Sequence, residues 1–177
     1  QGVIMVASAG NNGDAGMGYP GAYAPVISVA ASGWIGEWTT GSWWYAVNVA
    51  DPTNPVDFYI TDFSSRQLAG QDLDVAAPGS WVVGPYQLQA GKISYDYLGG
   101  TSMASPHVAG IVALMAQKNP ALTAAGAETI LETSAIPLPA GCRTVMDPNL
   151  GEGEVCWGNN ATGAGLATAD AALKAIP

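Results

Sequence analysis

The sequence has little histidine and little positive charge. Its 177 residues include one His and five Lys plus Arg, against 14 Asp plus Glu, and the formal net charge is −9. Nucleic-acid binding needs clustered Lys and Arg that displace counterions, whereas the five cations here are scattered along the chain. The composition therefore argues against a nucleic-acid partner.

Cysteine is also scarce, and this excludes common metal sites. Cys142 and Cys156 bracket a Gly/Pro-rich segment, and the sequence has no CxxC pair and no second His that would complete a zinc site. Two cysteines at this spacing on a loop favour a disulfide in an extracellular chain. We predict a disulfide between them, on a loop.

Long apolar runs are missing as well. The longest runs, such as residues 111–116, are far too short to span a bilayer, and no basic segment followed by an apolar run opens the sequence as a signal peptide would. Apolar residues still make up 49%, enough for one globular domain with a sizeable core. We expect no membrane partner, and the low Lys content with many small and polar residues is typical of a secreted protein.

The apolar pattern predicts an α/β fold with strands first and helices last. Continuous apolar runs at 3–9 and 26–31 indicate strands buried on both faces of a parallel sheet. Further strands are predicted at 73–79, in a hairpin at 45–60, and in a hairpin at 81–100 that turns near Ala90 and Gly91. Helices are predicted at 102–117, 123–133 and 166–176, and the first is apolar nearly all round and therefore buried.

The stretch "GTSMASPHVAG", residues 100–110, places Ser102 at the start of the longest predicted helix. A helix N-terminus favours negative charge that develops nearby, although a serine there is more often a helix cap. His107 follows five residues later, about 140° around the helix axis, and is therefore turned away from Ser102. We predict that His107 packs or hydrogen-bonds structurally, so that this chain alone does not form a Ser-His-Asp site.

The same stretch resembles the serine box of the subtilisin-like serine proteases (subtilases) nearly residue for residue. Other segments resemble the same family: "VASAGNNG" (6–13), "YPGAYAPVISVAA" (19–31), "DFSS" with "LDVAAPG", and "GAGLATADAAL" (163–173). The resemblance leaves out about 140–160 and an aromatic-rich insertion at about 34–61 that holds four of the six Trp. It implies an α/β, subtilisin-like three-layer fold with a mainly parallel buried sheet, with residues 1–177 as the C-terminal part of a single catalytic domain.

The resemblance also implies that part of the catalytic site lies outside this sequence. The family's triad runs in the order Asp, His, Ser, and the motifs that carry Asp and His precede the segment matching 6–13. Neither motif occurs in the sequence. The implied partner is an N-terminal fragment of the same protease, separated by a break before Gln1 that could arise by autolysis, by maturation as in zymogen processing, or by truncation. It would stay bound because the buried strand at 3–9 needs neighbours.

Residue roles follow from the same resemblance. Ser102 is the implied nucleophile toward a peptide or protein substrate. Asn11 is the implied side-chain donor to the oxyanion, with Asn12 as its neighbouring alternative. The wall and base of the S1 pocket are assigned to Ser8, Ala9, Gly10 and Gly18. An uncharged pocket predicts large apolar or aromatic P1 side chains, unless Glu37 or Asp14 intrudes and favours basic ones.

No cofactor is expected for the chemistry, but structural Ca²⁺ is an open alternative. Many subtilases bind a cation through backbone carbonyls in the loop that matches Gly21, Tyr23 and Val26. Acidic residues could also bind Ca²⁺ near the insertion, but no spaced calcium-binding motif joins them, and surface solubility is the preferred interpretation. These residues are Asp51, Asp57, Asp62, Asp72 and Asp74.

Three alternatives remain at this stage. The chain could be a catalytically inactive subtilase-like binding or scaffold module without an Asp- and His-bearing partner. It could also be a hydrolase in which a carboxylate or lysine serves Ser102, although no Ser-x-x-Lys motif supports this. The aromatic insertion is expected to form a satellite core under a hairpin, or alternatively a contact surface for the substrate or for a neighbouring chain or domain.

Overall fold

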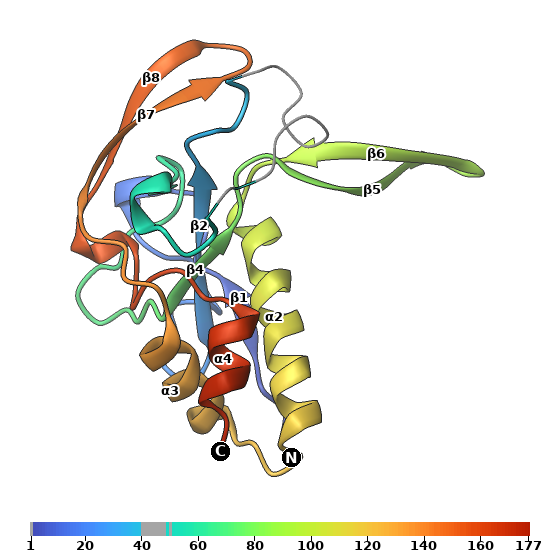
Figure 1. Ribbon diagram of the computed structural model, residues 1–177, viewed down its shortest axis with the longest axis vertical. Helices are drawn as coiled ribbons and strands as arrows, with labels where there is room; N and C mark the ends of the chain where they lie inside the picture. Colours follow the sequence, from blue (N-terminus) through green and yellow to red (C-terminus); the bar gives the residue numbers. More distant parts are fainter. Residues whose placement is uncertain (1, 40–48, 50) are drawn as a thin grey trace.

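The computed structural model describes residues 2–39, 49 and 51–177, and a four-stranded sheet lies at its centre (Figure 1). The longest strand, β2, pairs in parallel with β1 and β4, and β3 pairs antiparallel with its C-terminal end. The strands are β1 (Val6–Ser8), β2 (Ile27–Trp34), β3 (Phe58–Ile60) and β4 (Val75–Pro78). The predicted mainly parallel sheet is confirmed.

Both faces of β2 are buried, which explains its run of apolar and small residues. Ile27, Val29 and Ala31 join the core cluster on the helical side, whereas Ala30 joins the cluster on the other side. Because neighbouring residues of a strand face opposite sides, only a sheet covered twice tolerates such a run. Trp157, at the end of a later hairpin, helps to cover the second face.

Three helices cover one face of the sheet (Figure 1). They are α2 (Thr101–Lys118), α3 (Ala124–Ser134) and α4 (Ala169–Ala175). α2 packs on β1, β2 and β4, and α4 packs against both α2 and α3. The first two helices agree with their predicted ranges within one residue, whereas α4 begins three residues later than predicted, because Leu166 runs extended and bridges Ala76 and Ile136. Among the described residues, we find no helix with the length and apolar character needed to cross a membrane.

Two hairpins project from the end of the molecule toward which the N-terminus of α2 points (Figure 1). They are formed by β5 (Val82–Gln89) with β6 (Lys92–Leu98), and by β7 (Gly141–Asp147) with β8 (Gly151–Trp157). The β5–β6 hairpin turns at residues 90–91, as predicted.

The predicted disulfide between Cys142 and Cys156 is confirmed, but its predicted location on a loop is wrong. The two cysteines lie directly opposite each other in the β7–β8 pair. Glycines at 151 and 153 interrupt the alternation of side chains that would have indicated β8.

The aromatic insertion is described only in part. β3 is the second strand of the hairpin predicted at 45–60 and pairs with β2. Most of the first predicted strand lies outside the described residues, as do Trp43 and Trp44 just before it. Trp38 packs edge-on against Trp81 and Tyr97 at the base of the β5–β6 hairpin. The three rings are half-buried or exposed, so the choice between a satellite core and a contact surface stays a prediction.

Candidate functional site

Ser102 is exposed at the second position of α2. The turn that leads to it is fixed by a hydrogen bond from the Gly100 amide to the Gly79 carbonyl (2.8 Å). Gly100 has a φ of 157°, a conformation that side chains disfavour. The Ser102 amide belongs to the first turn of α2, whose N–H groups have no partner within the helix. A hydroxyl and a free N–H donor therefore lie together at the positive end of a helix.

Asn11 is fixed against this helix end by Thr101. Its Oδ1 accepts hydrogen bonds from the Thr101 backbone N–H (2.9 Å) and hydroxyl (2.8 Å). The Thr101 hydroxyl in turn accepts from the Gly10 amide (3.2 Å). Since Oδ1 is occupied, the amide group turns Nδ2 toward the start of α2, 3.5 Å from where a Cβ on Gly100 would lie. Asn11 Nδ2 and the Ser102 N–H are thus two donors at one end of the helix.

Thr101 is the residue of this arrangement that sequence reasoning missed. Its side chain is fully buried, although it stands next to the exposed Ser102. It links the end of the β1 segment to the start of α2, about 90 positions apart in the sequence. The sequence shows that Thr101 precedes Ser102 in "GTS", but it does not show which groups hydrogen-bond to the Thr101 hydroxyl.

His107 is turned away from Ser102. Its ring is exposed, and Nδ1 lies 2.8 Å from the Met103 carbonyl, within the same helix. This agrees with the structural role predicted for it. Since His107 is the single histidine of the sequence, the chain contains no imidazole base for Ser102.

The residues expected at the S1 pocket lie together beside Asn11. Ser8 ends β1 and Ala9 and Gly10 follow it, and the Gly18 amide donates to the Ala9 carbonyl (2.8 Å). A Cβ placed on Gly18 would have no neighbour within 4 Å, so open space lies beside it. The structure thus brings the four proposed pocket residues to one place.

Neither carboxylate that could have changed this pocket lies in that space. Asp14 is exposed and faces Arg66 at 4.0 Å. Glu37 is buried elsewhere, where it accepts hydrogen bonds from the hydroxyls of Ser80 (2.6 Å) and Tyr59 (3.2 Å). The preference for large apolar or aromatic P1 side chains stays a prediction.

The buried position of Glu37 predicts a pH-dependent stability. Burial raises the pKa of Glu37 to about 7, although the hydrogen bonds it accepts favour the charged form. Between the ordinary pKa of 4.5 and this value, the folded protein keeps a proton that the unfolded chain releases. The free energy of unfolding should fall by about 3 kcal/mol as pH rises through this window, and Glu37→Gln should remove that part of the slope.

Urea unfolding near pH 5 and near pH 8 measures this contribution of Glu37. The exposed Glu152→Gln variant is the matched control and should keep the wild-type pH dependence. If Glu37→Gln keeps it as well, Glu37 is ionised in the folded protein throughout this range and the prediction is wrong.

An acidic cluster at the start of β4 is the arrangement in the described residues that best fits a cation. Asp72, Asp74 and Glu128 bring carboxylate oxygens within 4.8 Å of one another. Ser28 donates to Oδ2 of the buried Asp74, whereas Oδ1 of Asp74 is buried without a hydrogen-bond partner. Burial, opposed by the hydrogen bonds from Ser28, raises the pKa of Asp74. An unpartnered carboxylate oxygen among acidic neighbours is the ligand that Ca²⁺ prefers.

This cluster changes the interpretation of two earlier candidates. Asp72 and Asp74 were expected to aid solubility at the surface, but Asp74 is buried and faces Glu128 of α3. The carbonyl candidates Gly21, Tyr23 and Val26 lie in two successive turns, and the Tyr23 carbonyl already accepts from the Val26 amide (2.9 Å).

Comparison with known proteins points to one family. The model of the subtilase family of peptidases (Peptidase S8) matches residues 1–169. Among curated proteins, the chain is 40% identical over 110 residues to an extracellular protease of Xanthomonas campestris, and 35% identical over 141 residues to subtilisin DY of Bacillus licheniformis. These alignments cover 60% and 77% of this chain, but only 16% and 41% of the two relatives.

Solved structures give the same result. The chain aligns over 99% of its length with fervidolysin of Fervidobacterium pennivorans, a keratinolytic enzyme related to subtilisin, at 32% identity and a TM-score of 0.66. It aligns equally far with a protease of Pseudoalteromonas arctica, at 25% identity and a TM-score of 0.67. It covers 23% and 43% of those chains, so it spans less than half of each protein compared here.

Proposed function

Because this chain belongs to the subtilase family, we propose that it supplies the nucleophile and the oxyanion hole of a serine endopeptidase. The observation that carries the proposal is the joint placement of the Ser102 hydroxyl, the Ser102 N–H and Asn11 at the N-terminus of α2. An activated serine attacks a peptide carbonyl, and two donors stabilise the negative charge that develops on its oxygen.

The proposed reaction has two halves. Ser102 Oγ bonds to the carbonyl carbon while a base takes its proton, and the carbonyl oxygen becomes an oxyanion held by Asn11 Nδ2 and the Ser102 N–H. Collapse of this intermediate breaks the C–N bond, the amine leaves with the proton, and an acyl-enzyme remains. Water then repeats the attack and releases the acid. Ser8, Ala9, Gly10 and Gly18 would hold the P1 side chain.

We propose that the Asp and His of the triad come from an N-terminal fragment of the same protease. β1 supports this, because Val3 and Met5 beside it are 71% and 50% exposed. An apolar groove of about 440 Å³ runs between β1 and α2, with Val6 and Ala109 among its lining residues. A strand that is apolar on its uncovered side needs a neighbour. The fragment that carries the base would cover this groove and complete the domain.

Covalent labelling tests the proposed function. In the native sample, a fluorophosphonate should label Ser102, and Ser102→Ala should not be labelled. Intact mass and N-terminal sequencing should find a second polypeptide that carries Asp and His. A single folded species without this partner would contradict the split arrangement, and a paired sample that resists labelling would favour the inactive binding module.

The protease is further proposed to act outside the cell. The disulfide between Cys142 and Cys156 is the structural support, because such bonds persist in oxidising compartments. A related protein of Xanthomonas campestris is described as an extracellular protease.

We also propose that the cluster of Asp72, Asp74 and Glu128 binds structural Ca²⁺. Saturating Ca²⁺ should raise Tm by roughly 3–5 °C relative to a chelator. Glu128→Gln should abolish this Ca²⁺ response. It should also raise Tm in the chelator, because burial and the nearby Asp74 charge disfavour the ionised form of Glu128 in the folded protein and raise its pKa. Glu132→Gln changes the same side chain on the same helix and should keep the Ca²⁺ response. Equal responses in Glu128→Gln and wild type would contradict the site.

A further inference from the structure

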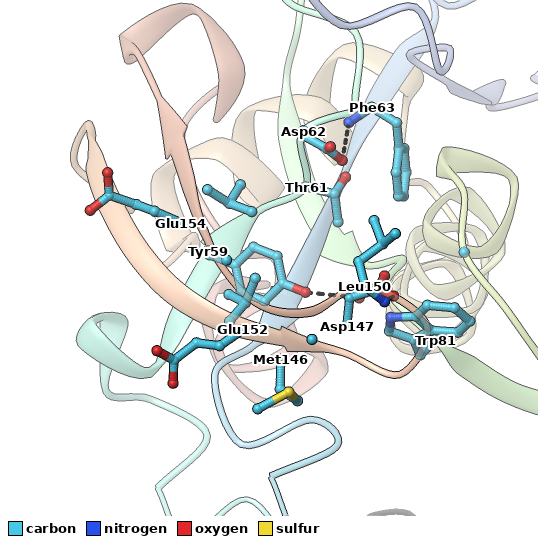
Figure 2. A pocket seen from close by; sticks show the side chains of 16 residues that line it. Tyr59, Thr61, Asp62, Phe63, Trp81, Met146, Asp147, Leu150, Glu152 and Glu154 are labelled. Atoms are coloured by element: carbon cyan, nitrogen blue, oxygen red, sulfur yellow. Dashed lines mark hydrogen bonds between the residues drawn. The ribbon is translucent and has the colours of Figure 1, made fainter.

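A cavity of about 510 Å³ lies between the β7–β8 hairpin and β3 (Figure 2). Tyr59 of β3, Phe63 and Trp81 contribute aromatic rings to its lining, and Leu150 at the hairpin tip adds a large apolar side chain. Leu150 is 89% exposed, so it lies at the open edge of the cavity. The lining is therefore rich in aromatic and apolar groups.

The hairpin leaves this cavity open because it turns a glycine toward the sheet. Gly153 of β8 lies directly opposite Val145 of β7, and residues paired in this way share one face of a hairpin. Val145 packs on the core cluster that contains Tyr59, so the shared face is turned toward β3. A Cβ placed on Gly153 would have no neighbour within 4 Å. The missing side chain of Gly153 thus provides part of the space.

The carboxylates of the hairpin do not enter the cavity. Glu152 and Glu154 alternate with Gly153 and share the face that carries the disulfide, and in Figure 2 both point outward, away from the Tyr59 ring. Asp147 accepts hydrogen bonds from two backbone amides of the hairpin turn (2.7 and 2.9 Å). The space between the hairpin and β3 is therefore suited to an apolar group.

The floor of the cavity is fixed by Tyr59. Its hydroxyl and that of Ser80 contact the carboxylate of Glu37, and the Thr61 hydroxyl donates to a backbone carbonyl of β2 (3.2 Å). A Cβ on Gly33, which pairs with Tyr59, would lie 2.4 Å from the Tyr59 ring, so only a glycine there lets the ring lie against β2. The hydroxyls of the floor are thus bonded within the protein, and the Tyr59 ring offers an apolar surface.

The cavity lies within substrate reach of the proposed nucleophile. Gly99 is part of its lining and stands three residues before Ser102, so their Cα atoms are at most about 11 Å apart. The Phe63 ring, also in the lining, lies 3.6 Å from where a Cβ on Gly99 would be. An extended peptide advances about 3.3 Å per residue, so the cavity faces a substrate residue within about three positions of the cleaved bond. The lining contains none of the residues assigned to the S1 pocket, so this position differs from P1.

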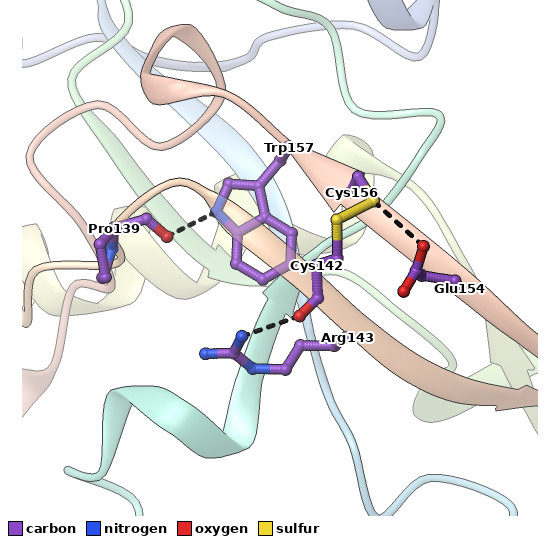
Figure 3. The surroundings of a disulfide bond; sticks show 6 residues. All are labelled: Pro139, Cys142, Arg143, Glu154, Cys156 and Trp157. Carbon is purple, nitrogen blue, oxygen red and sulfur yellow. Dashed lines mark hydrogen bonds between the residues drawn. A yellow bond between two sulfur atoms is a disulfide. The ribbon is translucent and has the colours of Figure 1, made fainter.

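The hairpin wall of the cavity is anchored at its root (Figure 3). The disulfide joins β7 to β8, and the buried Trp157 donates from Nε1 to the Pro139 carbonyl (3.1 Å). Arg143 lies over the Trp157 ring at 5.4 Å and donates from Nε to the Val56 carbonyl (2.8 Å). A wall that is held in place before binding reduces the ordering cost when a substrate enters.

We propose that this cavity, the hairpin subsite, binds a large apolar or aromatic side chain of the substrate at a position other than P1. Such a side chain would leave water and pack against the rings of Tyr59 and Trp81. Tyr59 and the hairpin lie in the two segments, about 34–61 and about 140–160, that do not resemble the family, so the subsite is a feature of this chain. The proposal rests on the proposed endopeptidase function.

Positional scanning of a peptide library with the complete protease tests the hairpin subsite. At one position within three residues of the cleaved bond, other than P1, Phe and Leu should be preferred over Ala by about tenfold or more in kcat/KM. Gly153→Val fills the cavity with a branched side chain and should lower this preference below about threefold, and Gly153→Ala should give an intermediate value. High salt should leave the preference unchanged, because no charge contributes to it.

Gly84→Val is the matched control for these variants. Gly84 also lies in a hairpin strand, and a Cβ placed on it would have no neighbour within 4 Å, but it is not part of the cavity lining. Its substitution should keep the wild-type preference. Gly153→Val should keep Tm within about 2 °C of wild type or raise it, because a branched side chain suits a strand better than glycine does.

The outcomes separate this inference from the proposed function. Normal labelling of Ser102 by a fluorophosphonate, but no apolar preference outside P1, overturns the hairpin subsite alone and leaves the N-terminal fragment as the occupant of the cavity. A preference that is unchanged in both Gly153 variants overturns it as well. Absence of labelling in wild type overturns the proposed function and the subsite with it.

Discussion

Ser102→Ala should lower kcat/KM of the complete protease by more than about 10⁴-fold while the protein stays folded. Without the hydroxyl no acyl-enzyme forms, and only binding and the oxyanion donors still lower the barrier. Because the Ser102 side chain is exposed, its loss should leave Tm nearly unchanged. Hydrolysis of a chromogenic peptide, with Tm measured in parallel, gives both values.

Ser105→Ala is the matched control for this prediction. Ser105 lies one turn further along the exposed start of α2 and is half-buried, so the same substitution should keep activity close to that of wild type. Substantial hydrolysis by Ser102→Ala would contradict the assignment of the nucleophile. An equal loss in both variants would trace the effect to the helix instead of the Ser102 hydroxyl.

The local features of this site could be predicted from the sequence because they depend on spacing along one helix. The five-residue separation of Ser102 and His107 fixes their relative direction, and His107 indeed contacts the Met103 carbonyl. The predicted strand at 26–31 could be read from its apolar run because both faces of the sheet are buried.

Features that depend on distant partners could not be predicted in the same way. The hydrogen bonds that Thr101 makes with Asn11 and Gly10 cross about 90 positions of sequence. The sequence left open whether the Glu37 side chain enters the S1 pocket, but Tyr59 and Ser80 hold it in a separate buried hydrogen-bond network. A charged residue within an aromatic segment does not show which of these environments it occupies.

The β7–β8 hairpin shows the same limit. The cysteine count predicted the disulfide, but the glycines in β8 interrupt the alternating pattern by which the strand that carries Cys156 could have been predicted. The cavity that this hairpin forms with Tyr59 and Phe63 therefore could not be predicted from the sequence.

Asn11→Ala should lower kcat with little change in KM, and the loss of a side-chain oxyanion donor in a subtilisin, about 10²–10³-fold in kcat, sets the scale. The donor stabilises charge that exists only in the transition state, so its loss affects kcat more than substrate binding. Asn12→Ala, the adjacent exposed asparagine, should retain nearly full activity. An equal loss in Asn12→Ala would move the donor role to Asn12 or implicate the whole turn.

The alanine variant also removes the acceptor that holds Thr101, so a second substitution must separate geometry from catalysis. Asn11→Asp keeps an oxygen that can accept both Thr101 hydrogen bonds, but it replaces the Nδ2 donor with a second oxygen and adds negative charge. It should preserve Tm within about 2 °C and still lose at least as much kcat as Asn11→Ala. Near-normal kcat in Asn11→Asp would show that Asn11 acts by holding the start of α2, and that the oxyanion receives its second hydrogen bond from another donor.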